Sequence, residues 1–150
     1  MTIQPATAED LEPLIPLFAA YLVFYAVPRP LPAIRAFLAA RLARSDSAIF
    51  LARDGAGQVQ GFVQLYPLFA SLELAPTWLV SDLYVAEPAR RQGLGEALMQ
   101  AARVHGEATG ACGLLLETAR TNQAAQALYE RLGYVRDTLY YSYWLNLAPA

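Results

Sequence analysis

Two arginines and two glycines stand where an expected helix begins. Arg90 and Arg91 come just before Gly93 and Gly95 in the stretch ARRQGLGEAL, residues 89–98. Glycine lets a backbone approach a ligand closely, and the first amides of a helix have no acceptor within it. A helix start of this kind with arginines beside it is typical of a site for phosphate groups.

Other interpretations of this turn are a plain strand-to-helix connection with solvated arginines, or a nucleotide site. Glu117 follows the next expected strand, as the ribose-binding acid of a dinucleotide fold would. However, Leu98 stands where a third small residue belongs, and too little chain follows Glu117 for a second half. A P-loop is excluded because no G-K-[ST] is present.

Asp82 and Glu117 are candidates for a general base. An amine is mostly protonated at neutral pH, so a base, acting directly or through water, or a desolvating site must free its lone pair. Asp82, two residues before Tyr84 on an expected strand, is the first candidate and Glu117 the second. Either residue could instead form an ion pair or be a surface carboxylate, and Asp82 could recognise the charge of a cationic substrate.

Asn122 and Tyr129 lie seven positions apart on an expected last helix, so that both side chains face the same way. A tyrosine phenol is protonated at neutral pH and can donate a proton to a leaving group. Taken singly, Asn122 is equally well explained as a helix cap and Tyr129 as a core aromatic residue.

The elements expected around these residues alternate between strands and helices. The strand-helix-strand order from Trp78 to Leu116 predicts a right-handed parallel crossover in an otherwise antiparallel sheet. The expected fold class is α+β, with a mixed, twisted sheet, helices on both faces and one domain over residues 1–150. Strands are expected within 2–7, 48–54, 59–67, 77–85, 113–118 and 138–147, and helices after Thr7, around 34–42, after Gly95 and from Asn122 through Gly133.

Local sequence also predicts details of these helices. Thr7 followed by Asp10 resembles a capping box that starts the first helix. Pro13 and Pro16 should kink that helix or move its start to a later residue. Gly133 stands where a glycine is expected to end the last helix.

Composition excludes several classes of protein. The net charge is −2 and no face collects Lys or Arg beyond Arg90 and Arg91, so no nucleic-acid partner is expected. The apolar run 14–28 is too short for a bilayer, and acidic residues precede it, so neither a membrane span nor a signal peptide is expected. A single cysteine, Cys112, suits a reducing compartment and is expected to be a small buried residue. The expected location is the cytoplasm.

His105, the only histidine, is expected to be a satisfied residue near the end of its helix. His, Cys, Asp and Glu residues nowhere show the spacing of metal ligands, so no metal is expected.

Two phrases together resemble the GNAT superfamily of acyl-CoA-dependent N-acyltransferases: LYVAEPARRQGLGEALM and LLLETARTNQAAQALYERLGY. Arg90, Gly93 and Gly95 fill its loop pattern [R/Q]-x-x-G-x-[G/A]. The resemblance covers about Trp78 to Tyr134 and implies a GNAT-like sheet of six to seven strands. SDLYV and GFVQLYPLFAS resemble the branch with polyamine and histone or small-basic-protein acetyltransferases.

The resemblance implies acetyl transfer from acetyl-CoA to a primary amine by direct attack in a ternary complex. Amides from Gln92 to Glu96 would hold the pyrophosphate, residues 83–85 would pair with the pantetheine arm, and Tyr129 would be the general acid. An amide near Leu83 or Tyr84 would stabilise charge on the carbonyl oxygen. The implied cofactor-binding residues are Leu83, Tyr84, Val85, Arg90, Arg91, Gln92, Gly93, Leu94, Gly95, Glu96, Asn122 and Tyr129.

Acidic and aromatic residues predict a small cationic acceptor, polyamine-like or lysine-like. The expected acceptor-side residues are Tyr25, Tyr66, Glu73 and Asp82, with Phe69 and Trp78 nearby; Tyr25 and Trp78 could equally be core. As an edge strand, the aromatic stretch 138–147 would expose apolar side chains and unpaired backbone groups, which favours a homodimer that covers them. The resemblance implies the same, since the related proteins include dimers. Alternative functions are an inactive acyl-CoA-binding sensor or interaction module and, less favoured, a nicotinamide oxidoreductase.

Overall fold

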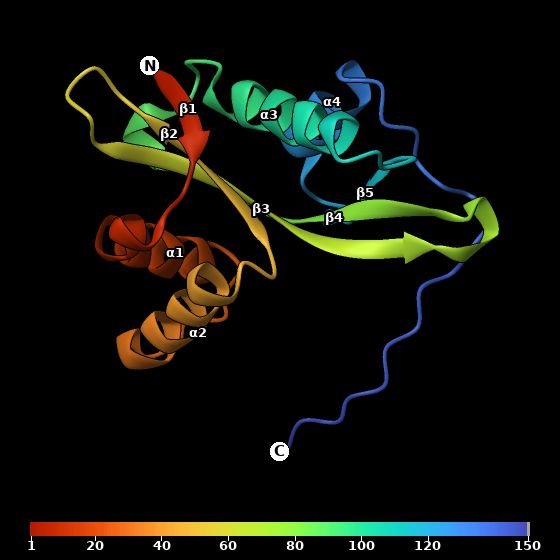
Figure 1. Cartoon of the computed structure of the whole chain (residues 1–150), viewed down its shortest axis with the longest axis horizontal. Coiled ribbons are helices and arrows are strands. Elements are labelled where there is room, and N and C mark those ends of the chain that lie inside the picture. The colour runs from red at the N-terminus through yellow and green to blue at the C-terminus, as the bar shows by residue number, and fades with distance from the viewer. Residues whose placement is uncertain (150) are drawn as a thin grey trace. The chain divides into compact units, whose positions relative to one another are not determined.

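The computed structural model describes residues 1–149, and their contacts group into two compact units. The first unit is Met1–Glu117, and the second begins at Thr118. The first contains, in chain order, β1 (Thr2–Pro5), α1 (Leu11–Phe24), α2 (Leu31–Arg44), β2 (Ala48–Arg53), β3 (Val59–Ala70), β4 (Ala75–Val85), α3 (Leu94–Ala108) and β5 (Leu114–Leu116) (Figure 1). The second contains α4 (Gln123–Arg131). One domain over residues 1–150 stays a prediction.

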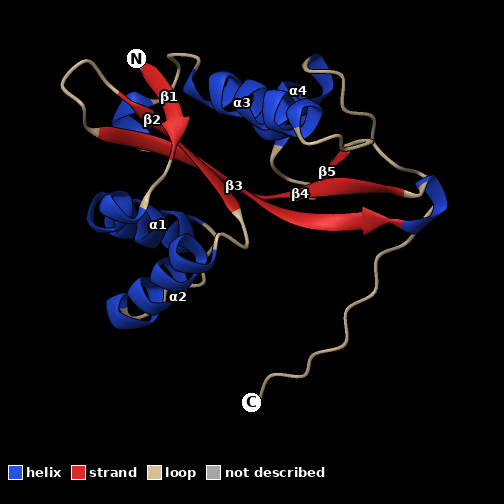
Figure 2. Ribbon diagram, viewed as in Figure 1, coloured by secondary structure: helices blue, strands red, loops and turns tan. Residues whose placement is uncertain are grey.

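A single sheet of five strands, in the order β1-β2-β3-β4-β5, organises the first unit. Strands β1 to β4 pair antiparallel, and β5 joins β4 in parallel (Figure 2). Because α3 connects β4 to β5, the predicted parallel connection within a mostly antiparallel sheet is confirmed.

The predicted number of six to seven strands is wrong, because the stretch from Thr138 to Leu147 forms no strand. Its large side chains are exposed to solvent, Tyr143 by 93 % and Trp144 by 88 %. Alternating aromatic residues form a strand only when a neighbouring edge supplies backbone partners and a surface to bury. Within residues 1–149 this stretch has no strand partner.

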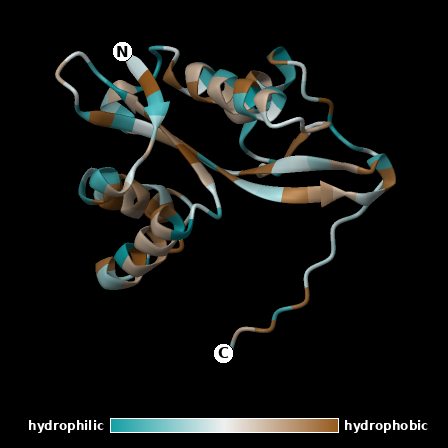
Figure 3. Ribbon diagram, in the orientation of Figure 1, coloured by the Kyte–Doolittle hydropathy of each residue, from teal (hydrophilic) through white to brown (hydrophobic). Residues whose placement is uncertain are grey.

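Helices cover both faces of the sheet, as predicted. Phe62 on β3 packs against Phe18 and Tyr21 of α1, with ring centroids 5.5 and 5.6 Å apart. The preceding residue, Gly61, faces α3, since a Cβ there would lie 3.2 Å from Leu98 Cδ1. Hydrophobic residues accordingly recur along β3 and β4 (Figure 3). The buried core on the α1 and α2 side is Leu14, Ile15, Leu17, Phe18, Ile34, Leu38, Ile49, Leu51 and Phe62.

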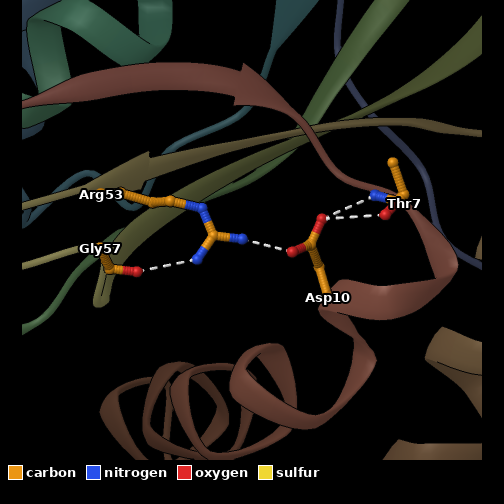
Figure 4. Close-up of polar contacts among 4 residues, drawn as sticks. All are labelled: Thr7, Asp10, Arg53 and Gly57. Atoms are coloured by element: carbon orange, nitrogen blue, oxygen red, sulfur yellow. Dashed lines mark hydrogen bonds and ion pairs between the residues drawn. The ribbon is translucent and has the colours of Figure 1, made fainter.

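The start of α1 is tied to the end of β2 through one carboxylate (Figure 4). The Thr7 amide donates to one Asp10 oxygen at 2.8 Å, and the capping box predicted for these residues is confirmed. The Arg53 guanidinium donates to the other Asp10 oxygen and to the Gly57 carbonyl. These contacts fix α1 on the sheet, and with it the side chains that α1 directs toward the site.

Two prolines do not delay α1. The helix begins at Leu11, directly after a 3-10 turn at Ala8–Asp10. Pro13 lies in the first turn, where an amide would have no acceptor within the helix, and Pro16 lies inside the helix with its ring exposed. The later start that these residues suggested is not observed.

In the second unit, α4 has the expected ends. The Asn122 side chain accepts a hydrogen bond from the Ala125 amide at 3.1 Å, which confirms the helix cap. Gly133 has a left-handed φ of +97°, and the Tyr134 amide donates to the Tyr129 carbonyl at 3.0 Å. The glycine stop is confirmed, although the helix itself ends at Arg131.

Candidate active site

The turn between β4 and α3 has a backbone suited to an anion. After a 3-10 turn at Glu87–Ala89, Arg91 adopts a φ of +65° and Gly93 a φ of +78°. Left-handed residues within a turn help to direct amides toward one concavity. A Cβ on Gly93 would meet no atom within 4 Å, so the backbone conformation, rather than space, favours glycine.

The first amides of α3 lie at the end of this turn. The first hydrogen bond of the helix runs from the Ala97 amide to the Gly93 carbonyl at 3.0 Å. The amides of Leu94 and Gly95 precede it and have no acceptor within the helix. They stand at the positive end of the helix dipole, with Gln92 exposed beside them. This arrangement fits the phosphate groups predicted from the sequence.

Arg90 is turned back toward the end of β4. Its Nε donates to the Val85 carbonyl at 2.9 Å, and its guanidinium carbon lies 5.5 Å from the Phe24 ring centre and 5.4 Å from that of Tyr84. Stacking and hydrogen bonding thus hold the positive charge beside the turn. Arg91 is exposed to solvent.

The central strand β4 has a free edge next to this turn. The parallel ladder with β5 covers only Trp78–Val80, whereas pairing with β3 continues to Val85. The Ala86 amide donates to Gln60 on the β3 side at 2.8 Å. Since successive peptide groups of a strand alternate in direction, those of Leu83 and Val85 face the edge that β5 leaves uncovered. Of the two amides predicted to face a carbonyl oxygen, this alternation favours Leu83 over Tyr84.

A bulge lies where the ladder with β5 ends. Gln64 pairs with Asp82 and Leu65 with Val80, so Ser81 is an extra residue in β4. A bulge reorients the side chains around it. Asp82 therefore lies where β4 changes its register with β3 and where its pairing with β5 has ended.

The Asp82 carboxylate accepts two hydrogen bonds on opposite oxygens. Tyr21 Oη donates to Oδ1 at 2.7 Å, and Gln64 Nε2 donates to Oδ2 at 2.9 Å. Gln64 is fully buried, and its Oε1 accepts from Ser47 Oγ at 2.9 Å. None of the ion pairs within residues 1–149 includes Asp82.

Tyr66 lies close to this carboxylate. Burial raises the pKa of its phenol to about 12, and the negative charge of Asp82 adds to the effect. The Arg41–Asp46 ion pair, with Nε and Oδ1 2.8 Å apart, is also near enough to influence this pKa. Tyr66 is therefore a hydrogen-bond donor at any working pH.

The other predicted acceptor residues are spread over the first unit. Tyr25 is exposed and lies edge-on to Tyr21, with ring centroids 5.1 Å apart. Glu73 lies in the exposed turn joining β3 to β4; Ala75, where β4 begins, is seven residues from Asp82, roughly 20 Å along the strand. Phe69, near the same tip, is 86 % exposed. Tyr25 and Tyr66 thus share the region of Asp82, whereas Glu73 does not.

Trp78 belongs to the opposite face of the sheet. Its ring lies 4.7 Å from that of His105 on α3, and its indole donates to Thr109 Oγ1 at 2.8 Å. Of the two roles expected for Trp78, the structure supports packing beneath α3.

Glu117 ends the first unit, whereas Asn122 and Tyr129 belong to the second. Glu117 is exposed and follows Leu116, the last residue paired with β4. In the second unit, Asn122 caps α4 and the Tyr129 ring lies 6.0 Å from that of Tyr134. The roles of these three residues stay predictions.

His105 and Cys112 differ in detail from what was expected. His105 packs between Phe50 and Trp78, and burial lowers its pKa. The expectation of a satisfied imidazole is wrong, because its buried Nε2 has no hydrogen-bond partner within residues 1–149. Cys112 is exposed rather than buried, because it lies in the turn before β5.

No cluster of three or more His, Cys, Asp or Glu side chains within 1–149 could hold a metal ion. No helix there has the length and apolar character needed to cross a bilayer.

Tyr21, Gln64 and Ser47 were missed by the sequence interpretation. Tyr21 lies three residues after Phe18 and four before Tyr25, so helical spacing places it on the face that meets the sheet. Gln64 is a polar residue within an apolar strand, a pattern that indicates a buried hydrogen bond. For Ser47 the sequence offers no comparable signal.

Comparison with known proteins agrees with this geometry. Residues 14–134 match the Acetyltransferase (GNAT) family. The chain is 38 % identical over 147 residues to the uncharacterised N-acetyltransferase YhfO of Bacillus subtilis, covering 98 % of each, and 34 % identical to a probable acetyltransferase of Haemophilus influenzae, covering 69 % and 70 %. The crystal structure of a probable acetyltransferase, 38 % identical, superposes with a TM-score of 0.93 over all of both chains. The chain therefore belongs to the GNAT acetyltransferase family and is an acyltransferase.

Proposed function

We propose that the protein transfers an acetyl group from acetyl-CoA to a primary amine of polyamine-like or lysine-like type, by direct attack in a ternary complex. The observation that carries this proposal is the end of the β4–β5 ladder at Val80. Beyond Val80, peptide groups of β4 face no neighbouring strand, between the turn before α3 and the Asp82 carboxylate.

The residues present fit acetyl-CoA. Amides of the turn and first helical residues, from Gln92 to Glu96, would hold its pyrophosphate with the charge of Arg90 and Arg91. The amide and carbonyl of Leu83 and the amide of Val85 would pair with the pantetheine arm as with an added strand, while the Val85 carbonyl accepts from Arg90. Asn122 would contact the same arm. Acetyl-CoA supplies an acyl group activated as a thioester.

Each chemical requirement of amide formation has a candidate residue. Asp82 would accept the proton of the attacking amine, directly or through water, with Glu117 as second candidate. The Leu83 amide would stabilise negative charge on the carbonyl oxygen. As the C–N bond forms and the C–S bond breaks, the Tyr129 phenol would donate its proton to the departing sulfur.

Charge and aromatic surface support a cationic acceptor. No cation pairs with Asp82 within residues 1–149, and the rings of Tyr25 and Tyr66 lie in the same region. A substrate ammonium would meet both a carboxylate and aromatic faces there. Resemblance to polyamine and histone or small-basic-protein acetyltransferases favours the same class of acceptor.

A thiol-release assay tests this proposal. Calorimetry first establishes uptake of acetyl-CoA, and a panel of polyamines, lysine-containing peptides, neutral amines and acidic amines then follows release of the CoA thiol. Turnover concentrated among the cationic amines supports the proposal. Uptake without turnover on any amine would instead support an inactive acyl-CoA-binding module.

The exposed aromatic stretch 138–147 supports a homodimer, because large apolar side chains in solvent are usually covered by a partner. Light scattering of the purified chain tests this, and a monomer at micromolar concentration contradicts it. A single cysteine supports the cytoplasm as the place of action, which fractionation of cells would check.

A further inference from the structure

We propose that Tyr21 and Gln64 are positioning residues that hold the Asp82 carboxylate in one orientation toward the acceptor amine. The inference rests on the proposed function, since it concerns the carboxylate assigned to the amine there. Its basis is that the two donors come from α1 and β3 and occupy opposite oxygens of one carboxylate, at 2.7 and 2.9 Å. Held on both sides, this group cannot rotate without breaking a hydrogen bond.

The Asp82 carboxylate sets the direction of the Gln64 amide, and Ser47 satisfies its other end. The end groups of a glutamine side chain, NH₂ and oxygen, are similar in shape but opposite in polarity. An ionised carboxylate only accepts hydrogen bonds, so the NH₂ end faces Asp82 Oδ2, and the Ser47 hydroxyl donates to Gln64 Oε1 at 2.9 Å. Gln64 is fully buried. A flipped amide would place its Oε1 against Asp82 Oδ2, so that two acceptors would face each other without water between them.

Aromatic packing fixes the Tyr21 hydroxyl. The Tyr21 ring lies 5.5 Å from Phe18, 5.6 Å from Phe62, 6.0 Å from Tyr84 and 5.1 Å from Tyr25. Rings on several sides leave the phenol little freedom, so its hydroxyl stays directed at Asp82. Both donors are neutral, so they orient the carboxylate while leaving its charge available to the substrate.

A double-mutant cycle isolates this role. Tyr21→Phe removes only the hydroxyl and keeps the ring packing, and Gln64→Met removes the other donor. In an otherwise normal chain each should lower kcat/KM for the preferred amine about tenfold, whereas the KM for acetyl-CoA changes less than twofold. In an Asp82→Asn background, Tyr21→Phe should lower kcat/KM less than twofold further, because there is no longer a charged carboxylate to position.

Gln60→Met provides the matched control. Gln60 Nε2 donates to Asp54 Oδ2 at 2.9 Å, so the control also removes a Gln–Asp hydrogen bond from β3, outside the acceptor region. It should leave kcat/KM for the amine unchanged. Thermal unfolding checks that Tyr21→Phe and Gln64→Met are folded at the assay temperature.

The outcomes separate this inference from the proposed function. Equal losses from Tyr21→Phe in the normal and Asp82→Asn backgrounds, or no loss in either, would overturn the positioning role while leaving amine acetylation intact. If Gln64→Met fails to fold, the Tyr21→Phe cycle still decides. A normal chain that acetylates no amine of the panel would overturn the proposed function, and this inference with it.

Discussion

Arg90 Nε donates to the carbonyl oxygen of Val85 at 2.9 Å, which links the turn before α3 to the last residue of β4. That carbonyl lies at the end of the free edge, so the bond occupies the final acceptor of the edge. It also brings the positive charge of Arg90 next to the start of α3. A ligand that pairs with the free edge of β4 and carries phosphates would reach the charge of Arg90 and the start of α3 directly beyond that edge.

Arg90→Lys tests this link. Lysine keeps the charge but can neither reproduce the Nε hydrogen bond nor stack on Tyr84 and Phe24 in the same way. We expect acetyl-CoA to bind about five- to tenfold more weakly, a loss of about 1 kcal/mol, as measured by calorimetry. Arg103→Lys on α3 is the control, since Arg103 is also exposed and pairs through its Nε with Glu107. Equal affinity for both variants would contradict a role for Arg90.

Gly93→Ala tests the backbone of the turn. At a φ of +78° an alanine is strained although its Cβ has room, so the free energy of unfolding should fall by about 1 kcal/mol. Acetyl-CoA binding should weaken as well, because the amides of the turn shift. Chemical denaturation and calorimetry measure the two effects. Gly113→Ala is the control. Gly113 has equal room for a Cβ and no positive φ, so the free energy of unfolding of this variant should be nearly unchanged. A Gly93→Ala protein as stable as that control would argue against strain.

Asp82→Asn tests the proposed base. The amide has nearly the same shape but neither charge nor useful basicity, so kcat for a cationic amine should fall about 100-fold or more. The affinity for acetyl-CoA should change little, because the role proposed for Asp82 is toward the amine and not toward acetyl-CoA. Steady-state kinetics with both substrates separate the effects. A higher amine KM with unchanged kcat would show that Asp82 recognises charge and that another group takes the proton.

Tyr129→Phe tests the proposed general acid. Loss of the phenol should lower kcat about 100-fold, because the sulfur would leave without a proton donor. Binding of acetyl-CoA should be largely unaffected. Single-turnover assays with saturating amine and calorimetry give the two quantities. An unchanged kcat would remove Tyr129 from the mechanism.

His105 predicts how stability depends on pH. Burial lowers the pKa of its imidazole below the ordinary 6.5, so the neutral form is favoured in the folded chain. Its contribution to stability is complete above pH 6.5 and is lost as the pH falls through the lower folded value. His105→Phe keeps the packing against Phe50 and Trp78 and should reduce the loss of stability between pH 7 and pH 5. Urea unfolding at both pH values measures this, and equal losses in both proteins would contradict it.

Several elements could be predicted because their causes are local. Asn122 caps α4 with its own side chain, and Gly133 ends it with a backbone angle that glycine adopts freely. Arg90, Gly93 and Gly95 predicted a turn before α3 because its conformation depends on adjacent residues; its role in binding an anion stays a prediction. The strand-helix-strand connection followed from element order. These features need no information about distant parts of the chain.

Predictions from the sequence were wrong where the structure of a segment depends on residues far away in the chain. Residues 138–147 have the composition of a strand, but a strand also needs a neighbour, and none pairs with it in the described chain. Cys112 was expected inside and lies in an exposed turn. Glu73 and Asp82 both looked suited to a cationic substrate, yet the register of β3 and β4 separates them.

By itself, then, the sequence determined the family, the turn and the central strand that carries Asp82. Only the tertiary structure decided what surrounds that carboxylate, because its donors are distant in the chain: Tyr21 is 61 residues away and Gln64 is 18. Spacing along a helix or strand reveals which face a side chain occupies. Which side chain it meets across that face depends on how α1 packs on the sheet and how β3 pairs with β4.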